Sequence, residues 1–201
     1  MKKLVFTLLI LTVGHFTSAQ NFGIKVGLNF ANAHLEDLGT VLTTTSLTGL
    51  QIGVIGDFNL SKSLYFGTGF LYSQKGFKMD FLGFEIKVPI SYFEVPMNLV
   101  YKHDLGGTKL FVLGGAYIGY GLSAKVKSGD EEEEIEFGSN DDQLKRIDSG
   151  LNFGTGIEFQ NIQLGINYEL GIIDLENLEE ATLKNRVFSI SIAYLLGKQN
   201  N

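Results

Sequence analysis

The sequence contains no cysteine and no tryptophan, and it has only two prolines and three histidines among 201 residues. Without cysteine there is no disulfide framework and no thiol for lipid attachment behind an export signal. The net charge of −6 supplies no basic surface, which argues against a nucleic-acid partner. The fold must therefore be held together by its sheet alone.

Long apolar runs are also missing, because no segment approaches the roughly 20 residues that a membrane-spanning helix needs. A shorter apolar segment at residues 4–13 follows two lysines and precedes small side chains. This order predicts a secretory signal peptide over residues 1–19, cleaved after Ala19, and a mature domain over residues 20–201. The exported chain is expected either to be soluble or to span a membrane with strands.

What the sequence has in quantity is alternation of large apolar residues with small or polar ones. The clearest example is residues 147–174, where two alternating runs flank a two-residue turn at 160–161. A period of two is typical of β-strands with two different faces. Similar runs bring the predicted total to eight strands, the others being residues 22–30, 50–58, 64–74, 88–101, 109–125 and 187–196.

Two of these strands are irregular. Pro96 lies inside the fourth, and because proline cannot donate to a ladder we expect a bulge or a missing hydrogen bond there. The fifth, residues 109–125, is rich in glycine and apolar on both faces, so its pattern leaves the register open.

The chemistry of the two faces indicates which side of the strands meets lipid. Large apolar side chains fill one face, whereas charged residues share the other with glycine. Glycine suits the crowded inner wall of a narrow barrel, and a Lys or Arg on a lipid face costs roughly 2–4 kcal/mol. We therefore predict an all-β protein, an eight-stranded antiparallel up-and-down transmembrane barrel in the outer membrane. An exported soluble lipocalin-like carrier, which also has eight strands, is an alternative.

The connections alternate between short and long, as in outer-membrane barrels with short periplasmic turns and longer external loops. The short ones are residues 59–63, 102–108 and 160–161, and a long loop is predicted at 75–87. Outer-membrane lipid and the barrel-assembly machinery are the expected partners. An external protein or ligand is possible at the other long loops, residues 32–46, 123–146 and 174–186.

Polar residues on the inner face predict a network inside the barrel: Lys25, Asp57, Glu94, Asp148, Glu158 and Glu169. An eight-stranded barrel is only wide enough for its own side chains. We therefore expect a filled lumen, with a hydrogen-bonded plug around Lys25, Tyr65 and Tyr92. Because carboxylates outnumber cations, a narrow cation-preferring channel is the alternative function.

No catalytic, cofactor or metal site is expected. His34 lies in the first predicted loop and His103 in a predicted turn, so the two would sit at opposite ends of the barrel. A barrel hydrolase needs a Ser or Thr beside a His, and Ser73 and Ser91 have no such neighbour in the pattern. The acidic run at residues 130–134 is expected to be a solvated loop, with a divalent-cation site as the alternative.

Four segments, residues 22–29, 92–96, 113–117 and 148–158, together with small residues at 18–19, carry a family resemblance. The sequence resembles the PorT-like small outer-membrane β-barrel family of Bacteroidota. The resemblance implies an eight-stranded barrel in the outer membrane of a Gram-negative bacterium and accommodates Pro96. It implies no activity, so the expected function is of a structural or interaction type.

Overall fold

The computed structural model describes residues 21–81, 84–178 and 181–196, and the predicted signal peptide lies outside them. In these ranges, no helix is long and apolar enough to cross a membrane. The long strands are β1 (Asn21–Asp37), β3 (Thr45–Asn59), β4 (Leu64–Phe81), β5 (Phe84–Asp104), β6 (Thr108–Ser128), β8 (Ile147–Phe159), β9 (Ile162–Gly171) and β10 (Ala181–Leu195). Two short strands, β2 (Thr40–Leu42) and β7 (Glu131–Ile135), pair with β1 and β6.

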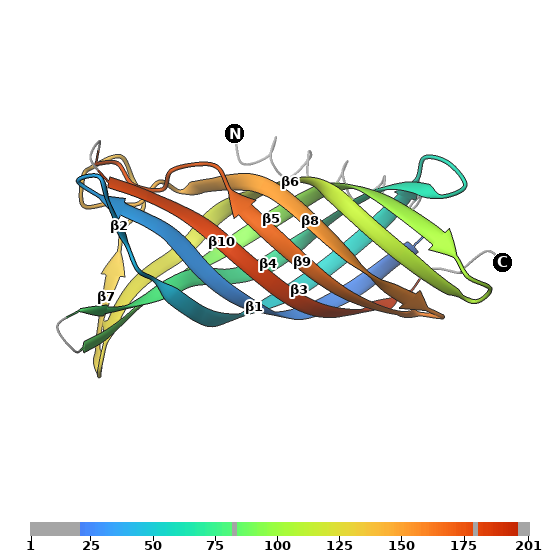
Figure 1. Ribbon diagram of the computed structural model, residues 1–201, viewed down its shortest axis with the longest axis horizontal. Helices are drawn as coiled ribbons and strands as arrows, with labels where there is room; N and C mark the ends of the chain where they lie inside the picture. Colours follow the sequence, from blue (N-terminus) through green and yellow to red (C-terminus); the bar gives the residue numbers. More distant parts are fainter. Residues whose placement is uncertain (1–20, 82–83, 179–180, 197–201) are drawn as a thin grey trace, which may run out of the picture.

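The long strands close into a barrel. Each pairs antiparallel with the next long strand in the chain, and β10 pairs with β1. The strands run obliquely to the long axis of the barrel (Figure 1). This is the predicted eight-stranded up-and-down architecture, and it leaves no open edge between the long strands.

The two ends of the barrel differ. One end, here called the turn end, carries the connections at residues 60–63, 105–107 and 160–161 together with the C-terminal end of the described chain. At one of these turns the Asp104 carboxylate accepts a hydrogen bond from the backbone N–H of Gly106, where φ is 81°. The opposite end, here called the hairpin end, carries β2 and β7 (Figure 1).

Six of the eight long strands extend beyond their predicted ranges, and β5 and β6 reach 21 residues. The prediction of a loop at residues 75–87 is wrong. The ladder between β4 and β5 continues from the pair Lys75–Ile90 to the pair Phe81–Phe84. The predicted loops at 32–46, 123–146 and 174–186 likewise contain strand, and β5 continues to Asp104 within the predicted turn at 102–108. The hairpin end is therefore built largely from continued β-sheet.

The apolar residues of the continued strands lie on the inner face, a reversal that ends the pattern of the lipid-facing segments. On β4, Tyr72 is exposed on the outer wall, whereas Phe77 further along the same strand is buried inside. Beyond this reversal the outward positions carry polar residues such as Lys78. An apolar interior with a polar outer surface is the pattern of a sheet that faces water.

The irregularity expected at Pro96 is present. Between β4 and β5 the ladder is interrupted from Thr68–Met97 to Leu71–Glu94, and the Thr68 hydroxyl donates to the Pro96 carbonyl at 2.7 Å. A register shift also occurs between β5 and β6, beside Ser91 and Tyr92. The register of β6 is now defined, because Phe111 and Tyr117 face inward while Val112 and Ile118 face outward.

Candidate functional site in the barrel lumen

The barrel has an apolar outer wall and a polar interior. Ile24 on the wall is 48% exposed, whereas Glu94 inside is 1% exposed. Five of the residues predicted for the lumen are buried on the inner face: Asp57, Glu94, Asp148, Glu158 and Glu169. The sixth, Lys25, is half-buried and lines a cavity among them.

The first ionic group is here called the Lys75 cluster and consists of Lys75, Glu94, Asp148 and Glu169. The Lys75 Nζ lies 2.6 Å from Glu94 Oε2, 2.8 Å from Glu169 Oε2 and 3.4 Å from Asp148 Oδ2. These side chains, which come from β4, β5, β8 and β9, are at most 4% exposed. A single cation thus joins four strands across the lumen.

Neighbouring polar side chains complete the Lys75 cluster. The Tyr117 hydroxyl donates to Asp148 at 3.2 Å, and the Lys75 Nζ lies 3.9 Å from the centre of the Tyr117 ring. Asn185 Nδ2 on β10 lies 3.0 Å from Asp148 Oδ2 and 3.2 Å from the Tyr92 hydroxyl. Such hydrogen bonds and the ring contact offset part of the cost of burying these charges.

The second group, here called the Lys102 cluster, lies toward the turn end and consists of Lys102, Asp57 and Glu158. The Lys102 Nζ is 2.7 Å from Asp57 Oδ2 and 2.6 Å from Glu158 Oε2. Lys109 approaches the other oxygen of Glu158 at 3.8 Å. The Lys102 Nζ also lies 4.9 Å from the centre of the Tyr65 ring.

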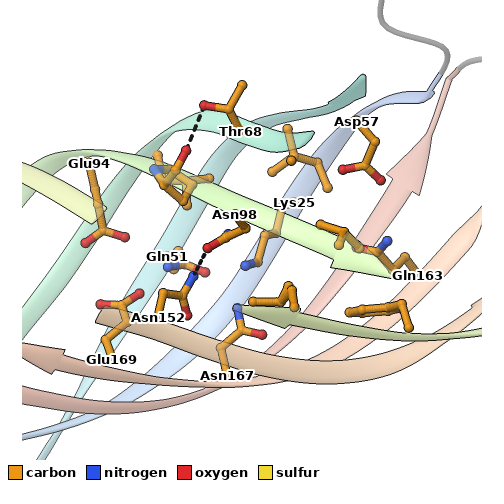
Figure 2. Close-up of a pocket in the computed structure, with 17 residues that line it drawn as sticks. Lys25, Gln51, Asp57, Thr68, Glu94, Asn98, Asn152, Gln163, Asn167 and Glu169 are labelled. Atoms are coloured by element: carbon orange, nitrogen blue, oxygen red, sulfur yellow. Dashed lines mark hydrogen bonds between the residues drawn. The ribbon is translucent and has the colours of Figure 1, made fainter. Parts of the chain in front are cut away.

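A polar cavity of about 60 Å³ lies between the two clusters. In Figure 2, the Lys25 side chain reaches into it with Glu94 and Glu169 on one side and Asp57 on the other. Among the described residues, no carboxylate lies within 4.0 Å of the Lys25 Nζ. A polar cavity of this size holds a few water molecules.

The lining of the cavity contains buried acceptors that have no partner among the described residues. In this part of the chain the side-chain oxygens of Gln51 and Asn152 accept no hydrogen bond, although Gln51 is only 1% exposed. Asn152 Nδ2 does donate to Asn98 Oδ1 at 3.3 Å (Figure 2). Water in the cavity would satisfy these acceptors and the Lys25 ammonium together.

The cations that organise the lumen are the residues that the sequence reasoning missed. The plug was expected around Lys25, but the lysines that pair with the buried carboxylates are Lys75 and Lys102. Tyr65 and Tyr92 do lie beside these two lysines. The sequence pattern predicts a loop at Lys75 and a turn at Lys102, although each residue continues the inward period of two of its strand.

An apolar cluster lies at each end of this polar interior. At the hairpin end a buried cluster contains Phe77, Ile90, Leu144 and Leu175 beside Tyr92. At the turn end Tyr65, Val100 and Phe111 form a smaller cluster.

The loops at the hairpin end are tied to each other as well. Asn177 Nδ2 contacts the backbone carbonyls of Gly138, Asn140 and Gln143 at 2.8–3.2 Å. The Asp174 carboxylate accepts from the backbone N–H of Leu183 at 2.9 Å. The hairpin end is therefore a defined surface.

The acidic run at residues 130–134 is not a loop, because most of it forms β7 against the end of β6. Glu132 pairs with Lys125 and lies 2.5 Å from the Nζ of Lys127. Hydrogen bonds from these two lysines lower the pKa of the Glu132 carboxyl to about 2. The run is exposed to solvent, as predicted, although it forms a strand instead of a loop. The described residues include no group of three or more His, Cys, Asp or Glu that could hold a metal ion.

The two histidines of the described residues, His34 and His103, lie at opposite ends of the barrel. His34 is on the outer face of β1, where its Nε2 lies 3.7 Å from Glu36. His103 is exposed at the turn end. Ser73 is bonded to Asn29 and Ser91 to Tyr72, so neither of these serines contacts a histidine in the described structure.

Comparisons with known proteins agree with the barrel architecture. A family profile described as "Outer membrane protein beta-barrel domain" matches residues 17–177. A search of curated protein sequences gives no match.

Solved structures give a similar result. The outer membrane protein OprG from Pseudomonas aeruginosa is 13% identical, with a TM-score of 0.52 over 90% of this chain and 98% of that chain. Neisserial surface protein A is 14% identical, with a TM-score of 0.48 over 86% and 96% of the two chains. The attachment invasion locus protein Ail of Yersinia pestis is 18% identical, with a TM-score of 0.43 over 89% and 99%. At these identities, the likeness to OprG supports the fold alone.

Proposed function

Because this chain belongs to the family of outer-membrane β-barrel domains, we propose that it is a closed, non-conducting barrel of structural or interaction type. Its location is the outer membrane, where its apolar wall meets lipid. A soluble lipocalin-like carrier would need the opposite arrangement, with apolar residues inside and charges on the outer wall.

The observation that carries the proposal is the Lys75 cluster. Its four charged side chains come from four strands and meet at one point of the lumen, with almost no exposed area. The apolar cluster around Phe77 and Ile90 lies on one side of it, and the Lys102 cluster lies on the other. A hydrated ion would have to displace several of these contacts to pass.

We propose further that the hairpin end faces outward and that the turn end is periplasmic. The supporting observation is the difference in length between the connections, which outer-membrane barrels show in this sense. The described part of the rim formed by residues 32–46, 123–146 and 174–186 would then offer a surface to an external protein or ligand, with Asn177 tying two of its loops together. Insertion would require the barrel-assembly machinery, and the four segments noted above support a place among PorT-like proteins of Bacteroidota.

Single-channel recording in planar bilayers tests the closed lumen. Protein refolded into vesicles is first checked for heat-modifiable gel migration, so that silent bilayers cannot reflect missing barrels. We expect no conductance above that of the bare membrane. Discrete current steps from correctly folded protein would overturn the proposal.

A narrow cation-preferring channel is the second candidate. Two observations favour it: the cavity beside Lys25, and the fact that buried carboxylates outnumber the lysines inside. The five carboxylates are Asp57, Glu94, Asp148, Glu158 and Glu169. Its signature would be a reversal potential that follows the cation gradient. A Glu94→Gln variant should reduce that selectivity if the path passes the Lys75 cluster.

We also propose that the protein is not an enzyme. The support is the distance in the fold between His34 and His103, and the engagement of Ser73 and Ser91 with other side chains. Refolded protein should release no fatty acid from phospholipid vesicles. Release that is abolished by His34→Ala, but not by His103→Ala, would contradict this.

A further inference from the structure

Outward-facing cations at the hairpin end fall into groups that differ in how they are paired. Lys78 and Lys87, on β4 and β5, lie 3.4 Å and 2.9 Å from the two oxygens of Glu85. Lys125 and Lys127, on β6, both pair with Glu132. Each of these lysine pairs therefore already has an anionic partner within the protein.

Lys184 and Arg186 on β10 form a third pair with a different environment. They are two residues apart, so their side chains lie on the same face of the strand, roughly 7 Å apart. Across the ladder on β1, His34 is the partner of Lys184 and Asn32 is the partner of Arg186. Within the described residues, no carboxylate lies within 4.0 Å of either cation, and the nearby Glu36 contacts His34.

The pair sits where the lipid-facing wall ends. On β10 the outward positions run from Ile190 and Phe188 to Arg186, so the change from apolar to charged occurs in one step. Phe188 is the ladder partner of Phe30 on β1, and their ring centres are 6.3 Å apart. Aromatic rings on the outer wall of a barrel lie at membrane interfaces. The outer-face residues that come next toward the hairpin end, such as Arg186, therefore meet the headgroup layer.

We propose that Lys184, Arg186, His34 and Asn32 form a binding site for the phosphate of a phosphorylated lipid in the surrounding leaflet. The guanidinium fork of Arg186 can bind two phosphate oxygens at once, and Lys184 adds a mobile point charge. On the neighbouring strand His34 is the ladder partner of Lys184, and Asn32, whose amide nitrogen also contacts the Thr44 carbonyl at 3.4 Å, is the partner of Arg186. The proposal concerns the outer wall and does not depend on whether the lumen conducts.

The first experiment compares matched double variants. Lys184→Gln/Arg186→Gln removes the two cations that have no carboxylate within 4.0 Å in the described ranges. Lys78→Gln/Lys87→Gln removes the same charge where Glu85 already pairs with both lysines. Both variants are first checked for heat-modifiable migration. Binding of phosphatidic acid to the detergent-solubilised full chain is then titrated by native mass spectrometry, with phosphatidylcholine as the neutral reference.

We expect the first variant to bind phosphatidic acid about 25-fold more weakly, at roughly fivefold for each cation lost near a charged surface. The control variant should stay within about twofold of the wild type. Equal losses in both variants, or none in the first, would overturn the site. An excess of inorganic phosphate that displaces phosphatidic acid would argue for a free anion and against a lipid headgroup.

A second measurement uses the wild-type chain, so it does not depend on the folding of a variant. The sequence has two arginines, Arg146 and Arg186, which makes selective ¹⁵N labelling informative. In vesicles that contain phosphatidic acid, solid-state NMR should detect a ³¹P contact at the Arg186 guanidinium. Arg146 is the internal control, because its Nη1 donates to the Gly121 carbonyl at 3.1 Å and Arg146→Lys assigns the signals. No ³¹P contact at Arg186 would refute the proposal.

Discussion

Replacing Lys75 by methionine should destabilise the barrel strongly. Among the described residues, the substitution removes the one ammonium that pairs with Glu94, Asp148 and Glu169, whose side chains are at most 4% exposed. Breaking one buried ion pair by deleting a partner costs about 3–5 kcal/mol, because the remaining charge is left without compensation. Three carboxylates lose their cation here, so we expect a loss of unfolding free energy of at least about 3 kcal/mol.

The measurement is urea-induced unfolding of the barrel in lipid vesicles, followed by heat-modifiable migration. Lys25→Met is the matched control, since it also removes an inward lysine but one without a carboxylate within 4.0 Å in the described structure. Its cost should stay below about 1 kcal/mol.

A compensating variant makes the test sharper. Lys75→Met combined with Glu94→Gln and Glu169→Gln removes two of the stranded charges and should recover much of the lost stability. If Lys75→Met costs no more than Lys25→Met, Lys75 does not hold the strands together and the reasoning is wrong.

Three further outcomes follow from the same structure. Lys102→Met should lower the unfolding free energy by about 3 kcal/mol in the same urea assay, because it strands two buried carboxylates. Gly150→Ala should cost about 1–3 kcal/mol, since an added Cβ would lie 2.1 Å from a backbone oxygen, whereas at outward Gly114 the nearest atom is 3.8 Å away and alanine should be neutral. The contribution of the Glu132 ion pairs should be present above pH 4.5, the ordinary pKa, and be lost only as pH falls through about 2. Carboxyl ¹³C titration by NMR measures that midpoint, and a midpoint near 4.5 would show that the pairs do not form in solution.

Alternation in the sequence was sufficient to predict the barrel. The run at residues 147–174 gave both strands and the turn of the β8–β9 hairpin, because a period of two assigns every side chain to a face. One face of each predicted strand is apolar and free of charge, which predicted contact with lipid. The match to an outer-membrane barrel family agrees with this prediction. Pro96 predicted the interruption of the ladder between β4 and β5, because a residue without an N–H cannot donate a ladder hydrogen bond.

Alternation does not identify the cations of the lumen. They lie where the large apolar residues of the outer face end, so the pattern that predicts a lipid-facing strand stops beside them. Lys75 stands at the point where β4 leaves the apolar wall, three residues after Tyr72 and two before Phe77. Its charge and the adjacent Gly76 resemble the composition of a loop. Only the pairing of Lys75 with Ile90 across the ladder shows that the strand continues and that this side chain points inward.

The change of the apolar residues from the outer to the inner side of a strand has a physical cause in the surroundings of that strand. A strand in lipid must place apolar groups outward, whereas the same strand in water must place them inward, and the closed ladder lets one β-strand do both. The change on β4 lies between Tyr72 and Phe77, and on β10 it lies at Arg186. On β4 and β10 the sequence thus shows the level at which the strand leaves the membrane. Lys75 lies inside the barrel near that level, where an apolar core begins on one side and a polar lumen on the other.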